Sequence, residues 1–155
     1  MGTRSLTKVI RTWEDTTGKK HRQPLTCMYR QYDGYMSGHG AELAEWLSGY
    51  TVVSGIPMDK SEPMFNGMDC LAAQMFVHFK SSGCKDDGTP TSNVGGIYCM
   101  HPDASECWEE YLYEISEEDK QIHLTVYEID SRSEATEIFH GTPEELLTKL
   151  ELDYA

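Results

Sequence analysis

Long apolar runs, an export signal and complete catalytic motifs are all missing from this sequence. No stretch approaches the roughly 18 consecutive apolar residues that a membrane-spanning helix needs. The first residues contain no apolar core of the kind found in secretory signals. We therefore expect a cytoplasmic protein that makes no contact with a membrane.

The number of cysteines does not suit a disulfide framework. The chain has five cysteines, Cys27, Cys70, Cys84, Cys99 and Cys107. An odd number without an export signal favours reduced thiols in a cytoplasm, so we predict no disulfides. The last three, together with His101, could be assembled into a zinc site, but no Cys-x-x-Cys pair anchors one. We predict no metal site and no cofactor.

Positive charge is scarce beyond residue 30. The chain has 13 Lys and Arg against 26 Asp and Glu, a net charge of −13. Residues 1–30 hold seven of the basic and two of the acidic residues, which leaves six against 24 elsewhere. Such a surface repels long nucleic acids, whereas a small nucleotide held by one local arginine is not excluded. The acidic excess is either a solvated face or a DNA-like surface that inhibits a host enzyme.

The order of the predicted elements indicates a single α+β domain covering residues 1–155. Alternating polar and apolar residues predict strands at 4–11, 25–31, 51–56, 97–100, 108–115, 121–129 and 136–139. Helical spacing predicts helices that begin near 41, 68 and 143. We expect a mainly antiparallel sheet with about three helices packed on one face. The polar segments 14–24 and 81–95 read as a hairpin loop and a mobile loop, the second a candidate lid.

Two helix starts have capping signals. Thr142-Pro-Glu-Glu145 is a strong one, with Thr142 as the cap, Pro143 at the first helical position and Glu145 closing a capping box. Asn66 precedes the central helix in the same way, and Asp69 lies near the positive end of that helix.

The stretch from Met28 to Trp46 brings together a strand end, a glycine-rich turn and a helix start. Gly34, Gly38 and Gly40 permit positive φ angles, and Ser37 could cap the helix that follows. A helix start exposes unpaired N–H groups that suit a phosphate or carboxylate. Arg30 could add a bidentate clamp to the same anion.

These features predict a site for a small nucleotide-like ligand. Arg30 and the turn would hold phosphate, an aromatic ring would stack on a base, and polar side chains would supply specificity. The predicted ligand-binding residues are Arg30, Tyr32, Asp33, Tyr35, Ser37, Gly38, His39, Gly40, Asn66 and Gln74. The alternative is an ordinary connection between a strand and a helix, with the glycines serving only the turn.

Cys70, Gln74 and His78 recur every four residues and so share one stripe of the central helix. Such a stripe either faces a pocket beside the glycine-rich turn or belongs to the core, which is the commoner case.

Two His-x-Thr triplets, His123-Leu-Thr125 and His140-Gly-Thr142, offer an enzymatic alternative. Two-histidine phosphoesterases use this pair of residues twice to activate a phosphodiester. Their motifs lie far apart in sequence, whereas seventeen residues separate the histidines here, and Thr142 already has a capping role. No Walker loop, nucleophile elbow, zinc-protease helix or EF-hand loop is present. A binding protein is therefore favoured over a phosphodiesterase that cleaves a cyclic nucleotide.

The sequence resembles a group of uncharacterised small proteins from bacteriophages and bacteria. They begin Met-Gly-Thr-Arg-Ser-Leu-Thr and share the segments found here at residues 28–35, 38–44, 66–74 and 78–80. The resemblance covers roughly the first hundred residues. It implies a phage or prophage setting, in the cytoplasm of the host cell, where small phage proteins often counter host defence by sequestering nucleotide signals. A homo-oligomer and a host protein partner are further expectations.

Overall fold

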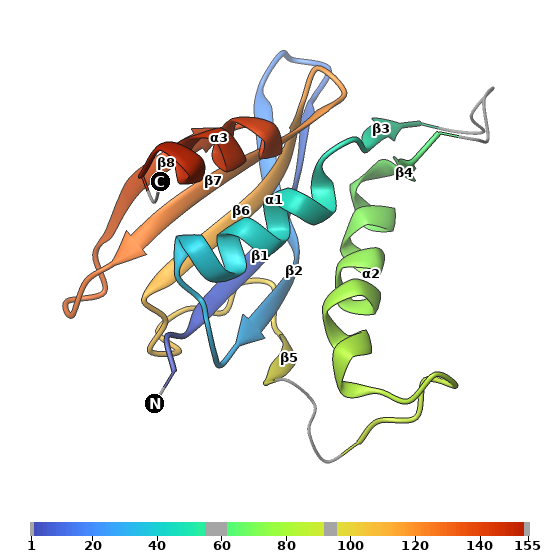
Figure 1. Ribbon diagram of the computed structural model, residues 1–155. Coiled ribbons are helices and arrows are strands. Elements are labelled where there is room, and N and C mark those ends of the chain that lie inside the picture. The colour runs from blue at the N-terminus through green and yellow to red at the C-terminus, as the bar shows by residue number, and fades with distance from the viewer. Residues whose placement is uncertain (1, 55–61, 92–95, 154–155) are drawn as a thin grey trace.

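The computed structural model describes residues 2–54, 62–91 and 96–153. It contains a six-stranded sheet, a two-stranded sheet and three α-helices (Figure 1). The strands are β1 (Ser5–Glu14), β2 (Lys20–Arg30), β3 (Thr51–Val53), β4 (Met64–Asn66), β5 (Ile97–Met100), β6 (Tyr111–Glu118), β7 (Gln121–Ile129) and β8 (Ala135–Gly141). The α-helices are α1 (Ala41–Leu47), α2 (Gly67–Lys80) and α3 (Pro143–Asp153). The predicted α+β class is confirmed.

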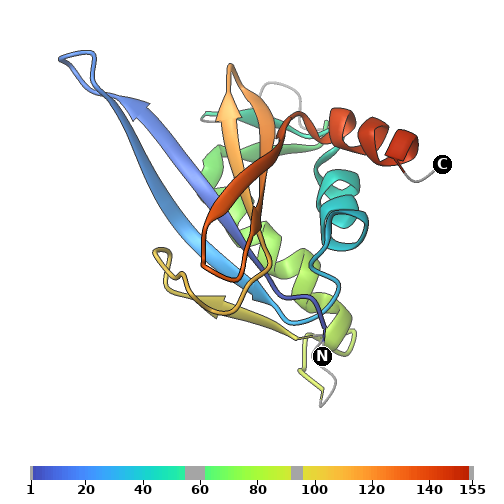
Figure 2. The same ribbon diagram turned by 90° about the vertical axis from the view of Figure 1, so that its left-hand side faces the viewer.

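The large sheet has the order β5-β2-β1-β6-β7-β8. Every neighbouring pair in it is antiparallel except β1 and β6, which run parallel. The first strand therefore lies in the middle of the sheet. The helices cover one face, and the long β1–β2 hairpin projects beyond them (Figure 2).

The core fills the space between the sheet and its helices. Strand residues that point toward the helices include Met28, Tyr113, Ile115, Leu124 and Val126, all essentially inaccessible to solvent. The helices contribute Leu43, Leu47, Leu71, Met75 and Leu146 to the same cluster. Side chains alternate along a strand, so the residues between these strand positions lie on the face without helices. None of the described helices is both long and apolar enough to cross a membrane.

Several predicted boundaries differ from the observed ones. Residues 20–24, expected in a loop, belong to β2, because the hairpin turn is confined to Asp15–Lys19 and the two strands pair to its ends. The strand expected at 108–115 begins at Tyr111. Part of the expected lid, 92–95, and the end of the strand expected at 51–56 lie outside the described residues.

Thr142 caps α3 as predicted, but the bond to the Glu145 carboxylate comes from the Thr142 hydroxyl and not from the Thr142 backbone N–H that a capping box uses. The backbone N–H of Glu145 donates to Thr142 Oγ1 over 3.2 Å, and the threonine hydroxyl donates to the Glu145 carboxylate over 3.2 Å. Pro143 occupies the first helical position. The helix buries Leu146 and Leu150, so its end is held by both capping and packing.

Thr142→Ala is expected to lower the free energy of unfolding by about 1 kcal/mol, because the Glu145 amide loses its acceptor. Urea denaturation followed by circular dichroism measures the change. Thr148→Ala, an exposed change on the same helix that removes only a hydroxyl bond to the Glu144 carbonyl, is the control. Equal stability losses in the two variants would contradict the capping role.

Candidate functional site

The glycine-rich turn does not form the predicted phosphate cradle. Residues Met36–Gly40 make a π-helical turn that runs directly into α1. Ser37 caps neither segment, since neither has a side-chain hydrogen bond at its N-cap. The N–H groups of Gly38 and Gly40 donate to the Tyr35 carbonyl, and that of His39 donates to the Asp33 carbonyl. The amide donors expected to bind an anion are thus used within the turn.

Glycine is required in this turn because other atoms approach it closely, and not because the φ angles are positive. The left-handed residue is Asp33, with a φ of 59°. A Cβ atom on Gly34 would lie 2.8 Å from Ser5 Cβ, and one on Gly38 would lie 2.5 Å from the Asp33 carbonyl oxygen. The prediction of positive φ at Gly34, Gly38 and Gly40 was wrong. Contacts with the start of β1 explain Gly34, and contacts with Tyr113 of β6 explain Gly40, whereas Gly38 is crowded by Asp33 within the turn itself.

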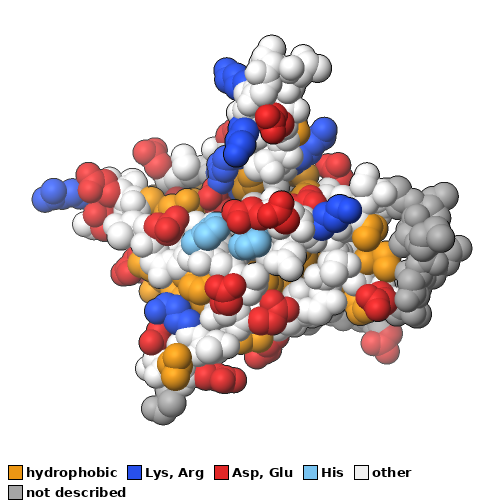
Figure 3. Space-filling model, turned by 90° about the horizontal axis from the view of Figure 1, so that it is seen from above, with side chains coloured by type: hydrophobic (Ala, Val, Ile, Leu, Met, Phe, Trp, Pro, Cys, Tyr) orange, Lys and Arg blue, Asp and Glu red, His pale blue; other side chains and the backbone are white. Residues whose placement is uncertain are grey.

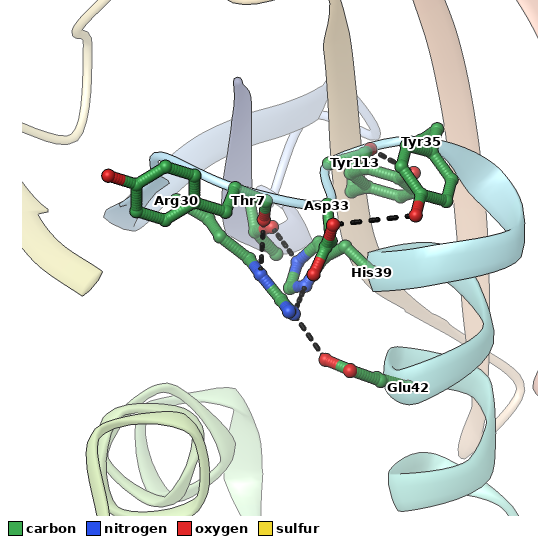
Figure 4. A network of polar contacts seen from close by, with 9 residues as sticks. Thr7, Arg30, Asp33, Tyr35, His39, Glu42 and Tyr113 are labelled. Carbon is green, nitrogen blue, oxygen red and sulfur yellow. Dashed lines mark hydrogen bonds and ion pairs between the residues drawn. The ribbon is translucent and has the colours of Figure 1, made fainter. Parts of the chain in front are cut away.

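Arg30, at the end of β2, is the centre of a polar network (Figure 4). Its Nε donates to the Tyr32 carbonyl over 2.7 Å, and its Nη1 donates to His39 Nδ1 over 2.9 Å and to the Glu42 carboxylate. The Arg30 side chain is 12% exposed. Within the described part of the chain, Nη2 makes no hydrogen bond, so one edge of the guanidinium remains available to a ligand.

His39 is fully buried beneath Arg30. Since the guanidinium only donates, Nδ1 of His39 has no proton, and Nε2 carries the proton donated to Thr7 Oγ1 over 2.7 Å. The ring also packs edge-on against Tyr113, with centroids 5.1 Å apart. Burial, and then the charge of Arg30, hold the pKa of His39 well below its ordinary value of 6.5. His39 is a neutral structural support for Arg30.

The other residues predicted at this corner point outward. Tyr32, Asp33 and Tyr35 are exposed, and the Tyr35 hydroxyl donates to Asp33 over 3.4 Å. Asn66 occupies the N-cap position of α2, but its side chain makes no capping hydrogen bond, contrary to the prediction. Of the predicted set, Arg30 and Gln74 line hollows beside α2.

The hollow next to Arg30 lies between α1 and α2 and is here called the helix groove. It has a volume of about 440 Å³ and is lined by Arg30, Glu42, Glu45, Trp46, His78, Phe79 and Ile97. Trp46 and His78 stack across it, with ring centroids 5.1 Å apart and planes 14° from parallel. Burial lowers the pKa of His78, which keeps its imidazole neutral, although the carboxylate of Glu42 acts in the opposite direction.

A second hollow, of about 450 Å³, adjoins the helix groove on the other side of Trp46. Cys70 and Gln74 line it, together with Tyr50 and Phe65, whose rings stack at 4.4 Å. The stripe predicted on α2 therefore faces the two hollows. The pocket interpretation of that stripe describes its position better than the core interpretation.

Sequence reasoning missed Trp46 and the two acidic residues of the groove. Glu42, Glu45 and Trp46 follow the i, i+3, i+4 spacing that places side chains on one helix face, and this signal was present in the sequence. What the sequence lacked was the partner for that face. His78 is 32 residues farther along the chain, on a helix whose position depends on the whole sheet.

The zinc ligand set considered from the sequence does not assemble. Among the residues described, no three His, Cys, Asp or Glu side chains are grouped to hold a metal ion. All five cysteines are free thiols. Cys27 is buried in the sheet, and burial raises its pKa to about 12, so its thiol is unreactive at neutral pH.

Comparison with family models, with curated proteins and with solved structures found no match in any of the three.

Proposed function

We propose that the protein binds a small nucleotide-like molecule in the helix groove and holds it without cleaving it. The observation that carries this proposal is the stacked pair of Trp46 and His78 beside the available edge of Arg30. An aromatic ring stacks on a nucleobase whatever the base, and a guanidinium binds an oxyanion. The groove thus pairs the two groups that recognise a base and its phosphate.

Trp46 supplies the stacking surface. Its rings are too close to His78 for a base to fit between them, so a ligand takes the place of the imidazole on the indole. His78 is on the exposed side of α2 and is neutral, so moving it breaks no ion pair. Phe79 supports the inner edge of Trp46, with centroids 5.7 Å apart.

The charge of the groove limits what it accepts. Glu42 pairs with Arg30, and Glu45 adds a second carboxylate at the rim. Two carboxylates beside one guanidinium disfavour a triphosphate, whereas both can accept hydrogen bonds from ribose hydroxyls or a base amino group. The supported ligand is a nucleoside or a nucleotide with few phosphate charges.

The resemblance to bacteriophage proteins gives this proposal its biological setting. A phage protein that holds a nucleotide signal of its host withholds that signal from the defence system that responds to it. On this proposal the protein acts by stoichiometric capture in the host cytoplasm, so it must be made in amounts that match the signal.

Fluorescence titration of a variant with Trp46 as its sole tryptophan tests the proposal. Trp13→Phe with Trp108→Phe produces it, because the chain has three tryptophans. We expect nucleosides, cyclic mononucleotides and cyclic dinucleotides to quench the fluorescence of Trp46, with binding at micromolar concentrations. Liquid chromatography should return the nucleosides and cyclic dinucleotides intact after long incubation. No quenching by any member of the panel at millimolar concentration would end the proposal.

A pair of tryptophan substitutions in the otherwise wild-type chain provides the matched control. By calorimetry, Trp46→Leu should weaken binding about 10-fold or more, since stacking on an aromatic side chain contributes about 1–3 kcal/mol per base. Trp108→Leu removes a tryptophan that is 82% exposed and outside the groove, and should leave affinity unchanged. Thermal unfolding of both variants establishes that each is folded at the titration temperature.

A further inference from the structure

The face of the sheet without helices carries a second cluster of titratable side chains. On β7, Leu124 and Val126 point into the core, so His123 and Thr125 point to the opposite face. His140 on β8 pairs with Thr125 in register and shares that face. The two histidines therefore meet across neighbouring strands. Figure 3 shows adjacent histidine side chains bordered by acidic ones.

The two imidazoles converge on one carboxylate. Their rings stack with centroids 5.7 Å apart and planes 19° from parallel. Glu118 reaches both: its carboxylate oxygens lie 3.5 Å from His123 Nε2 and 3.3 Å from His140 Nε2. The Glu118 side chain is 53% exposed and stands at the end of β6, so an incoming anion can displace it. Its carboxylate marks a position that both Nε2 atoms reach.

Their hydrogen bonds give the two histidines different roles. His123 Nδ1 lies 3.3 Å from the Gln121 carbonyl oxygen, which only accepts, so Nδ1 carries a proton and the neutral ring presents a lone pair at Nε2. His140 Nδ1 lies 2.8 Å from Thr125 Oγ1. A hydroxyl both donates and accepts, so Thr125 supports neutral and protonated His140 alike. We therefore assign the base to His123, which leaves the acid to His140.

A large hollow lies beside this cluster. It has a volume of about 820 Å³, within the range of small-ligand sites, and His140, Thr125 and Glu118 line it. The projecting β1–β2 hairpin contributes Trp13 and Arg22 to the lining of the hollow. The hollow can therefore accommodate a nucleotide-sized molecule next to His140, whose imidazole stacks on that of His123.

We propose that this hollow is a hydrolytic site for a phosphodiester, separate from the helix groove. His123 Nε2 accepts a proton from a water molecule whose oxygen forms a new bond to phosphorus. Protonated His140 donates its Nε2 proton to the ester oxygen as the bond between that oxygen and phosphorus breaks. The products are a phosphomonoester and an alcohol, and when the diester is cyclic both groups are on one product molecule. Proton exchange with solvent then restores both histidines.

The charges around the hollow define the substrate class. Glu114, Glu117 and Glu137 line it along with Glu118, and Arg22 forms an ion pair with Glu114. This excess of carboxylates repels phosphomonoesters and polyphosphates, which carry two or more negative charges. A diester carries one charge for each phosphate. The substrate is accordingly a diester with a single phosphate, such as a cyclic mononucleotide.

Release of p-nitrophenolate from bis(p-nitrophenyl) phosphate tests the proposal on the full chain. The wild type should release it faster than buffer does, whereas the doubly charged p-nitrophenyl phosphate should not react. His123→Gln and His140→Gln should each lower the rate about 100-fold or more. His101→Gln, a change at a histidine that is 75% exposed and remote from the cluster, should have no effect. Glu118→Gln should raise kcat/KM, because it removes a negative charge from the position of the phosphate.

Each remaining outcome overturns the site. The proposal is overturned if the wild type releases p-nitrophenolate no faster than the buffer blank between pH 5 and 9. It is also overturned if His123→Gln and His140→Gln both keep the wild-type rate, or if His101→Gln lowers the rate as much as they do. Circular dichroism verifies that the glutamine variants are folded, and His123→Asn with His140→Asn repeats the test if either is not. Trp46→Leu should retain hydrolysis, so a failure of this site and a failure of the helix groove are seen separately.

Discussion

Gly34→Ala is expected to lower the free energy of unfolding by about 3 kcal/mol, a cost at the upper end of those measured for overpacking. The new Cβ atom would lie 2.8 Å from Ser5 Cβ and 2.8 Å from the Thr3 carbonyl oxygen. Neither contact can be relieved by a side-chain rotation, because both involve the start of β1 close to its backbone. The turn would have to move away from the strand. That movement would also disturb the Gly34 carbonyl, which accepts a hydrogen bond from Tyr113 over 2.7 Å.

Chemical denaturation monitored by circular dichroism measures this cost, with Gly49→Ala as the matched control. Gly49 has a φ of +85° and open space around its Cβ position. Alanine at this position should lower the free energy of unfolding by only about 1 kcal/mol, because the left-handed backbone conformation is the sole source of strain. If Gly34→Ala proved no more costly than Gly49→Ala, the close approach of the turn to β1 would be contradicted.

His39→Leu should lower the free energy of unfolding by about 3 kcal/mol at neutral pH. The substitution places an apolar side chain of similar size against Tyr113 and Phe79, so packing changes little. It removes the acceptor for Arg30 Nη1 and the donor to Thr7 Oγ1, both in the interior. Buried polar groups without partners carry penalties of about 1–3 kcal/mol each. Urea denaturation at pH 7.5 measures the loss.

Acid should also destabilise the wild type through His39. Its folded pKa lies well below its ordinary value of 6.5, so between these two values the unfolded chain binds a proton that the folded chain does not. The contribution of neutral His39 is complete above about pH 6.5 and is lost as the pH falls toward the folded pKa. Denaturation midpoints measured from pH 7.5 to 4.5 should decline accordingly.

The difference between the wild type and His39→Leu isolates this effect. His78, whose pKa is also lowered, contributes in the same direction to both proteins and cancels in the comparison. The stability advantage of the wild type should shrink as the pH falls through this window. A constant difference between the two proteins would show that His39 does not titrate differently in the folded and unfolded states.

Local patterns were enough to predict much of the fold. The Thr142 cap depends on residues three apart, and the stripe of Cys70, Gln74 and His78 depends on the pitch of a single helix. Both are properties of a few neighbouring residues, so the sequence contains all the information they need. The α+β class followed from the order of such patterns.

Features that depend on distant contacts could not be predicted in this way. Gly34 and Gly40 are explained by Ser5 and Tyr113, and Trp46 has its stacking partner on another helix. The histidines of the two His-x-Thr triplets meet because β7 and β8 pair in one particular register, with an irregularity after Val126. Sequence separation was therefore a poor guide to whether His123 and His140 lie together.

The parallel pairing of β1 with β6 also determines when the protein can fold. A nascent chain emerges from the ribosome in order, and the neighbour of its first strand follows about a hundred residues later. Until then the backbone edge of β1 that pairs with β6 has no partner. Contacts between such distant segments slow folding, so we expect the domain to mature only after synthesis has passed β6.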